Sequence, residues 1–472
     1  MTTWVFDRSG CYSPDSFDIH KQPERFIRVI AGYTMMDEEQ LGLDIFIERD
    51  GDRQFVRVKH EGKEVRLELQ SNPLICQRAI VSRGTVCFLS RKEVSEDWEY
   101  VTKFSWTSDR RQPESTLLQR ANQKGVEGIA RLEGHCSIVS ISDMRSGMTF
   151  TTPYTFRGAS NITQSQSLHS PLPALSANKT RSWSSVVNSS ERSNKRKSAS
   201  TLPKPKRSRS GGNSVGASNE VTFEVQEKQG TSLFSAREDP YDNRILRCLV
   251  IFPAGRPIYT YRSPLELVQA LRDAIKAHQS LCLDGNILHR DISENNIIIT
   301  DRAKTGFAGM LIDMDLAKEL GKGPSGARRR TGTMEFMAIE VLLNKDHTYR
   351  HDLESFFYVL IWQCARRGWE YVGNPTGQPL SSHLTKWYMG TFEDIAITKG
   401  GLVENAERFE LLTNEFPPEL ERLKPLCRRL RRILFPWNGH IVFTGTPKDP
   451  KVLYGPMIEA FDQAIDDLGK VE

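Results

Sequence analysis

Residues 287–299 read Ile-Leu-His-Arg-Asp-Ile-Ser-Glu-Asn-Asn-Ile-Ile-Ile. The polar middle has the spacing H-R-D-x-x-x-x-N, which places the carboxylate of Asp291 five positions before the carboxamide of Asn296. This spacing is typical of phosphoryl-transfer sites, in which the acid is the base and the amide is a metal ligand. The apolar flanks at 287–288 and 297–299 predict short buried segments. One such match can arise by chance in a chain of 472 residues, so further motifs in the right order must support it.

Two acids follow an apolar run downstream, in Asp313-Met314-Asp315. A carboxylate at a strand end that faces the catalytic loop is where a Mg²⁺ ion bridging ATP phosphates is held. Two acids one residue apart more often belong to a turn, but their position after the first motif favours a metal site. The sequence therefore predicts Asp313 as the principal metal ligand and leaves Asp315 open as a second one.

Residues 332–340 resemble the end of a protein-kinase activation segment, G-T-x-x-[YF]-x-A-P-E, with isoleucine in the place of proline. The preceding residues 317–331 are rich in glycine and arginine and lack periodicity, as expected of a mobile loop. Two interpretations of this loop stay open. Thr331 or Thr333 could be phosphorylated and bound by Arg290, or the loop could be an ordinary solvated basic segment.

An acid precedes the strongly apolar helix predicted at 356–363. This acid, Asp352, either binds the backbone of the catalytic loop from below or is an ordinary acidic N-cap. We expect a structural role for it in both cases.

A nucleotide site also needs a lysine on a strand to hold the α- and β-phosphates, and a glutamate on the next helix to hold that lysine. Lys103 lies in a β-like run and Glu114 begins the following helical stretch, so we assign them these roles. The glycine-rich loop is reduced to Gly84 with small or polar neighbours such as Ser82 and Thr85, on which backbone approach to the phosphates would depend.

Hydrophobic patterns give the coarse order of elements. Strands are predicted at 85–89, 99–104 and 247–252, and helices at 113–124 and 265–281. Two partly alternating runs joined by Asp50-Gly51 predict a hairpin nearer the N-terminus. A small sheet followed by helices suits a two-lobed kinase.

In this order the motifs resemble eukaryotic protein kinases and, more narrowly, the fungal-specific protein kinase family. The similarity is carried by residues 4–10, 17–20, 287–293, 311–317 and 351–355. The resemblance implies an α+β, two-lobed fold with a small β-rich lobe and a large helical lobe, and it implies ATP and Mg²⁺ as cofactors. It also implies a protein substrate with a serine or threonine hydroxyl.

The roles that follow are assigned residue by residue. Asp291, Lys103 and Asn296 are the predicted catalytic residues. Lys103, Glu114, Gly84 and Asp313 are predicted to bind the nucleotide, and Asn296, Asp313 and Asp315 are predicted to hold metal.

Two departures from the kinase pattern keep other functions open. Ser293 stands where Ser/Thr kinases carry a catalytic-loop lysine, and Asp315 stands where the D-F-G element has glycine. A pseudokinase or scaffold that only binds partners is one alternative. A phosphotransferase that acts on small alcohols, such as aminoglycosides or choline, is the other, because Asp313 and Asp315 would form a paired-acid metal site.

Residues 157–219 differ from their surroundings, with 17 serines and a net charge of +10, against −5 for the rest of the chain. Such a stretch buries too little apolar surface to fold, so it is predicted to be disordered. Its basic clusters, Lys195–Lys197 and Lys204–Arg207, are either an address for a nuclear-import receptor or a solvated linker that binds nucleic acid non-specifically.

The eight cysteines form no C-x-x-C pair, which argues against a zinc cluster and a disulfide framework. No secretory segment or membrane span is expected, so an intracellular location, in the nucleus or cytoplasm, is predicted. The predicted organisation is an N-terminal α+β extension (1–75), a small lobe (76–156 and 220–253) interrupted by the insert, a large lobe (254–437) and a C-terminal tail (438–472).

Overall fold

The computed structural model describes residues 1–12, 16–60, 62–77, 82–146, 243–321, 331–371, 378–438 and 441–470. The predicted disordered insert at 157–219, with both basic clusters, lies outside the described residues. Most of the loop predicted at 317–331 also lies outside them.

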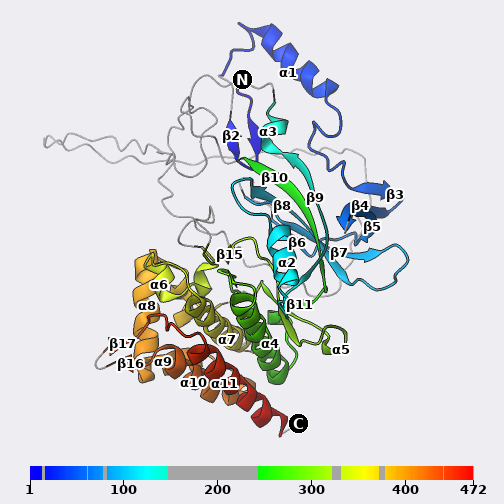
Figure 1. Cartoon of the computed structure of the whole chain (residues 1–472). Helices are drawn as coiled ribbons and strands as arrows, with labels where there is room; N and C mark the ends of the chain where they lie inside the picture. The colour runs from blue at the N-terminus through cyan, green and yellow to red at the C-terminus, as the bar shows by residue number, and fades with distance from the viewer. Residues whose placement is uncertain are drawn as a thin grey trace, which may run out of the picture. The chain divides into compact units, whose positions relative to one another are not determined.

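One antiparallel sheet dominates the N-terminal part of the described chain (Figure 1). Its strands lie in the order β3-β4-β5-β7-β8-β10-β9, and the short β6 pairs with β7. Lys59 on β4 also pairs with His135 on β9, so the path of strands returns on itself. The strands are β3 (Glu48–Asp50), β4 (Arg53–His60), β5 (Lys63–Leu69), β6 (Ile75–Cys76), β7 (Val86–Lys92), β8 (Tyr100–Ser108), β9 (Arg131–Ser140) and β10 (Arg244–Phe252).

The sheet confirms the local predictions. The hairpin at Asp50-Gly51 is formed by β3 and β4, which pair antiparallel around it. The strands predicted at 85–89, 99–104 and 247–252 are β7, β8 and β10. The same sheet contains strands from both sides of residue 76, where the small lobe was predicted to begin. The predicted domain boundaries stay predictions.

Three shorter elements accompany the sheet. A small hairpin is formed by β1 (Val5–Asp7) and β2 (Gly10–Tyr12) near the N-terminus. Helix α1 (Pro23–Met35) follows it, and α2 (Glu114–Gln123) packs against β9. The four-residue helix α3 is Ile141–Met144.

Helices make up most of the chain after β10, and α4 contacts both α7 and α11 there (Figure 1). The helices are α4 (Pro264–Leu283), α5 (Arg302–Thr305), α6 (Ile339–Leu342), α7 (Tyr349–Tyr371), α8 (Phe392–Glu404), α9 (Ala406–Thr413), α10 (Lys424–Leu434) and α11 (Lys451–Gly469). The short strands are β11 (Arg256–Pro257), β12 (Ile287–Leu288), β13 (Ile297–Ile299), β14 (Gly309–Leu311), β15 (Lys318–Glu319), β16 (Trp437–Asn438) and β17 (Ile441–Val442). This order confirms a β-rich N-terminal region followed by a helical C-terminal region.

The sequence explains the two longest central helices. Helix α4 begins after Ser263, whose hydroxyl accepts a hydrogen bond from the backbone N–H of Glu266, with Pro264 at the first helical position. Helix α7 has no solvent-exposed face along most of its length, because its residues 349–365 are all buried, including charged ones such as Asp352. A helix that is buried on every side lies in the middle of a core, so α7 is the central element of the helical region.

The described residues form two apolar clusters. A smaller one lies within the sheet and includes Phe88, Phe104 and Val250. A larger one joins α2 to the helices of the C-terminal region.

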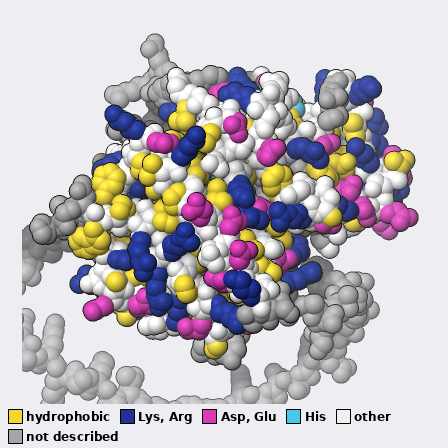
Figure 2. Space-filling view, turned by 60° about the horizontal axis from the view of Figure 1, so that its bottom comes forward, with side chains coloured by type: hydrophobic (Ala, Val, Ile, Leu, Met, Phe, Trp, Pro, Cys, Tyr) yellow, Lys and Arg dark blue, Asp and Glu magenta, His cyan; other side chains and the backbone are white. Residues whose placement is uncertain are grey.

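On the face shown in Figure 2, basic side chains are interspersed with acidic and apolar ones. This mixed pattern agrees with a basic excess that belongs to the insert rather than to the rest of the chain. Among the described helices, none has the length and apolar character needed to span a membrane.

Candidate active site

The predicted catalytic loop lies between β12 and β13 and is almost entirely buried. Arg290 has a left-handed backbone with φ of 69°, which is uncommon for a residue other than glycine. The nearby His289 donates from Nε2 to the carbonyl of Ile312 at 3.0 Å, and burial lowers the pKa of this imidazole. A neutral His289 therefore joins the loop to the strand end that carries Asp313.

Asp352 holds this loop from the side of α7. Both carboxylate oxygens accept the backbone N–H of Arg290, at 3.1 and 3.2 Å. The rings of His278 and His347 bond the same carboxylate at 2.8 and 2.7 Å. Burial alone would raise the pKa of Asp352, but the two histidines hold it well below its usual range. Of the two roles predicted for Asp352, the structure supports binding to the loop backbone, since the residue lies inside α7 and is not its N-cap.

Asp291 is fixed by the end of the predicted activation segment. Its Oδ1 accepts two hydrogen bonds from Thr333, from the backbone N–H at 2.9 Å and from the hydroxyl at 3.0 Å. Burial raises the pKa of Asp291, and the charge of Asp313 raises it further. A carboxylate with a raised pKa accepts a proton more readily, which suits a general base.

Asn296 closes the catalytic loop. The side-chain nitrogen of Asn296 donates to the backbone carbonyl of Asp291 at 2.8 Å. The backbone carbonyl of Asn296 accepts the N–H of Ile312 at 3.1 Å. With the amide nitrogen used in this way, the side-chain oxygen is the atom that could bind a cation. The loop thus places Asn296 beside the strand end at Asp313.

Lys103 lies at the centre of a buried charge cluster. Its ammonium donates to Glu114 at 2.8 Å, to Asp313 at 2.9 Å and to Asp315 at 3.1 Å. Burial would lower the pKa of Lys103, but these three acids raise it well above its usual value, so the ammonium keeps its charge. Glu114 also accepts the N–H of Met314 at 2.9 Å, which ties α2 to the predicted metal-binding segment.

The three acids lie close enough to share one cation. Ligand oxygens of Glu114, Asp313 and Asp315 are all within 4.8 Å of one another. Asp313 has a left-handed backbone with φ of 64°, a strained conformation of the kind found at functional sites. Its side chain is 23% exposed, against 6% for Asp315, so Asp313 is the more open carboxylate of this pair.

The loop before β7 brings a second cation to the cluster. The guanidinium of Arg83 donates to Asp315 at 2.9 Å and lies 4.0 Å from Asp313. The next residue, Gly84, has φ of 53°, and its N–H donates to the hydroxyl of Ser82 at 3.0 Å. A Cβ at this glycine would lie 2.5 Å from the guanidinium carbon of Arg8, so the N-terminal hairpin packs against the predicted phosphate-binding loop.

The segment 331–340 is anchored in the helical region. Lys399 on α8 is fully buried, and its ammonium donates to the backbone carbonyls of Glu335 and Met337 at 2.8 Å each. The same ammonium lies over the rings of Tyr358 and Trp387. This lysine therefore holds the backbone just after Thr333, the residue that bonds the predicted base Asp291.

Two comparisons with known proteins bear on the family of this chain. The family model described as fungal protein kinase matches residues 1–364. The chain belongs to this family. The match confirms the resemblance predicted from the motifs, and it covers all strands of the main sheet, the catalytic loop and the acid cluster.

A stretch of 97 residues of this fungal protein kinase family member is 31% identical to the probable serine/threonine-protein kinase drkC of Dictyostelium discoideum. The stretch is 21% of this chain and 13% of that protein. The chain therefore matches only a small part of this relative's length.

The structure brings six of the predicted residues into one cluster: Lys103, Glu114, Asp291, Asn296, Asp313 and Asp315. The seventh, Gly84, lies beside this cluster, next to Arg83. Their roles stay predictions. Sequence reasoning missed Arg83 as a member of the cluster and Thr333 as the partner of Asp291. The available signal for Arg83 was its position directly before the remaining glycine of a reduced loop.

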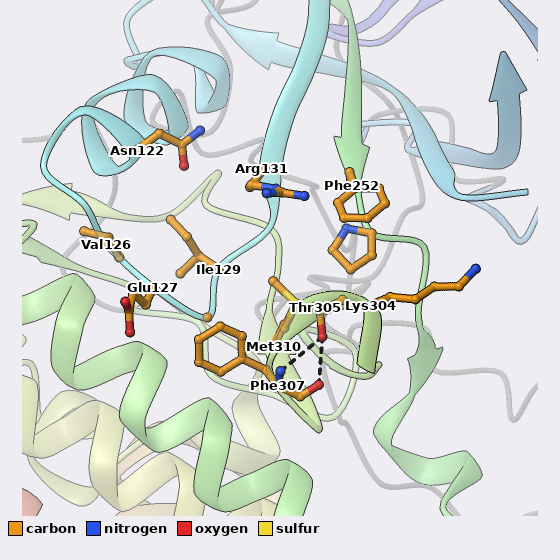
Figure 3. A pocket seen from close by; sticks show the side chains of 12 residues that line it. Asn122, Val126, Glu127, Ile129, Arg131, Phe252, Lys304, Thr305, Phe307 and Met310 are labelled. Carbon is orange, nitrogen blue, oxygen red and sulfur yellow. Dashed lines mark hydrogen bonds between the residues drawn. The ribbon is translucent and has the colours of Figure 1, made fainter. Parts of the chain in front are cut away.

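A cavity of about 390 Å³ is lined by other residues (Figure 3). It is bounded by Val126 and Ile129 before β9, by Phe252 at the end of β10 and by Phe307 and Met310 near β14. None of the predicted site residues lines it. The candidate active site is therefore defined by its charge cluster and not by this cavity.

Proposed function

We propose that this chain is an ATP- and Mg²⁺-dependent protein kinase with a two-lobed kinase fold, which phosphorylates serine or threonine hydroxyls of proteins. The observation that carries the proposal is the ammonium of Lys103, bonded at once to Glu114 and Asp313. A lysine oriented in this way brings its charge to the α- and β-phosphates of ATP. Membership of a protein kinase family supports the same activity.

The donor atoms fit Mg²⁺, which prefers carboxylate and amide oxygens. Asp313 and the side-chain oxygen of Asn296 would hold the ion, because both come from the strand end and loop that meet at Ile312. Mg²⁺ bound there supplies positive charge for the phosphates. Asp315 fits this role less well, because its carboxylate already accepts from Lys103 and Arg83.

Asp291 would act on the substrate hydroxyl. Both hydrogen bonds from Thr333 go to Oδ1, which leaves Oδ2 for the hydroxyl proton. As the substrate oxygen bonds the γ-phosphorus, the bond from phosphorus to the bridging oxygen breaks and the hydroxyl proton passes to Asp291. ADP and the phosphorylated protein are the products.

The first test separates an enzyme from a scaffold that only binds partners. ATP with Mg²⁺ is expected to raise the melting temperature of the wild type and to raise that of Asp313→Ala much less. Phosphate transfer by Asp291→Asn is expected to fall by about 10²–10⁴-fold, the usual contribution of a general base. Asp284→Asn, at an exposed acid just before the catalytic loop, is the matched control and should transfer normally. No nucleotide-dependent shift in the wild type would contradict the proposal.

The second test concerns the substrate class. Radiolabelled ATP is offered with a generic protein substrate, with aminoglycosides and with choline. We expect label on protein serine and threonine. Transfer only to a small alcohol would favour the phosphotransferase alternative and would contradict the proposed substrate.

Nuclear import stays a separate proposal, with Lys195–Lys197 and Lys204–Arg207 as the receptor's ligands. A fluorescent protein fused to residues 190–212 is expected to accumulate in the nucleus. The same fusion with alanine at the basic positions is expected to stay evenly distributed, and equal distribution of both fusions would contradict the proposal.

A further inference from the structure

The candidate active site has an excess of negative charge. Four acids gather there, namely Asp291, Asp313, Asp315 and Glu114, and a nucleotide would add the charge of its phosphates. Transfer of a phosphoryl group needs fixed positive charge near the transferred phosphate. Cationic side chains near these acids must therefore supply that charge.

Lys103 cannot meet this need alone. An ammonium has three donors, and the three hydrogen bonds of Lys103 go to three acids of the cluster. Its side chain is only 7% exposed. The catalytic loop adds no cation at Ser293, which is buried and whose hydroxyl has no hydrogen-bond partner among the described residues.

Arg83 is placed differently. Its side chain is 33% exposed, and its Nη1 bonds Asp315, which leaves further guanidinium donors for another acceptor. The open side chains of the cluster are thus a guanidinium at Arg83 and a carboxylate at Asp313, 4.0 Å apart. A cation and an anion side by side match a Mg²⁺-bound phosphate, which also presents both charges.

The backbone is anchored at this arginine and at the residue after it. Its carbonyl accepts the N–H of Trp106 at 2.7 Å, at the end of β8. The following Gly84 is packed under Arg8, and Asp7 beside that residue forms a buried ion pair with Arg145 at 2.6 Å. An arginine on an anchored loop loses less conformational entropy when it binds a phosphate.

Asp315 is the counterpart that orients this arginine. Its carboxylate is 6% exposed and accepts from both Lys103 and Arg83, at 3.1 and 2.9 Å. A buried carboxylate with two cationic partners has little capacity left for a metal ion. The geometry fits a positioning residue better than a second metal ligand.

We propose that Arg83 binds the γ-phosphate of the nucleotide and that Asp315 holds its guanidinium in position for this contact. The inference rests on the proposed kinase function. Arg83 then contributes, from the loop before β7, the positive charge that the catalytic loop lacks at Ser293. Asp315 acts through Arg83 and is a positioning residue.

The experiment measures the dissociation constants of ATP and ADP, each with Mg²⁺, by calorimetry on the full chain. Arg83→Gln is expected to weaken ATP by about 10–100-fold, the range for a hydrogen bond to a charged group, and ADP by less than about threefold. Asp315→Asn should weaken ATP by about 3–10-fold with little effect on ADP, and turnover of Arg83→Gln should fall by about 10²-fold. The control is Arg91→Gln, an ion-paired arginine at the other end of β7 with 25% exposure, which should leave both constants unchanged.

Equal weakening of ATP and ADP in Arg83→Gln, with normal binding by the wild type, would overturn this inference and leave the proposed function intact. Failure of the wild type to bind either nucleotide would overturn both. If Arg83→Gln does not fold, as judged by circular dichroism, the comparison is made on Arg83→Lys. That variant keeps the charge but loses the planar fork, so the ratio of the ATP and ADP constants should change by about 3–10-fold, and an unchanged ratio would contradict the inference.

Discussion

The catalytic loop at 289–296 and the loop at 82–85 face the same acids but are held in different ways. The catalytic loop is buried and bonded by neighbours in the helical region, above all by Asp352. The other loop reaches the acids through one partly exposed guanidinium, bonded to a residue 232 positions away in the sequence. The first arrangement fixes a base in advance, whereas the second leaves a cation that can exchange a carboxylate for a phosphate. Damage to the first should therefore reduce stability, and damage to the second should reduce nucleotide binding.

The largest expected effect is on the buried support of the catalytic loop. Asp352→Ala removes a buried carboxylate that accepts from Arg290, His278 and His347. Removing one partner of a buried, hydrogen-bonded charged pair typically lowers the free energy of unfolding by about 3–5 kcal/mol. Urea denaturation followed by far-UV circular dichroism measures this loss.

The control for this variant is Asp346→Asn, at an exposed acid a few residues away, which should change stability by less than about 0.5 kcal/mol. Similar, small losses in both variants would mean that the catalytic loop does not depend on its buried support. The contrast between the two loops would then fail.

The next effect concerns Glu114, on the nucleotide side of the contrast. Glu114→Gln keeps the shape and an acceptor for the N–H of Met314, but removes the charge opposite Lys103. The ammonium keeps Asp313 and Asp315 as partners, so we expect stability to change by no more than about 1 kcal/mol. The specificity constant for ATP should fall by about 10–100-fold, since a hydrogen bond to a charged group contributes about 1.5–3 kcal/mol.

Steady-state kinetics and urea denaturation on the same preparation test this prediction. The control is Glu127→Gln, an exposed glutamate after α2, which should alter neither quantity. A large loss of stability with normal kinetics would reverse the expected pattern.

The part of the site that could be predicted from the sequence is the part made of local motifs. Asp291 and Asn296 are five residues apart, and the strand just before Asp313 is visible as an apolar run, so this side of the site follows from spacing. Lys103 and Glu114 follow from a strand and the helix after it. Each of these patterns is contained in a short window, where periodicity and turn chemistry are informative.

The missed contacts join distant segments. A surface-loop arginine is normally solvated, and nothing near Arg83 in the sequence indicates that Asp315 lies beside it. A buried lysine is equally unexpected, because Lys399 depends on carbonyls and aromatic rings from three other elements. Such contacts depend on tertiary packing, which a single sequence does not reveal.

A smaller effect is expected at the contact between the activation segment and the base. Thr333→Val removes the hydroxyl bonded to Asp291 and keeps the backbone N–H that bonds the same oxygen. A hydrogen bond to a charged group contributes about 1.5–3 kcal/mol; because the backbone N–H still bonds the same oxygen, we expect the lower end, so kcat should fall by about tenfold with KM for ATP nearly unchanged. Thr331→Val is the matched control, because the buried hydroxyl of Thr331 has no hydrogen-bond partner among the described residues. Equal loss in both variants would show that the hydroxyl contact is not what orients the base.

Near neutral pH, the smallest effect is a pH dependence that Lys399 adds to the support of the same segment. Burial lowers the pKa of Lys399 to about 7, although the charges of Glu354 and Glu335 oppose the shift. In the unfolded chain the lysine pKa is about 10.4, so between about pH 7 and 10 the unfolded chain binds the extra proton and the folded protein does not. The free energy of unfolding therefore rises with pH through this window, by about 0.7 kcal/mol between pH 6.5 and 7.5. Urea denaturation at several pH values should show this rise in the wild type and a flatter curve in Lys399→Met. A parallel slope in both proteins would mean that the buried ammonium keeps its proton throughout, and that its bonds to the carbonyls of Glu335 and Met337 outweigh the effect of burial.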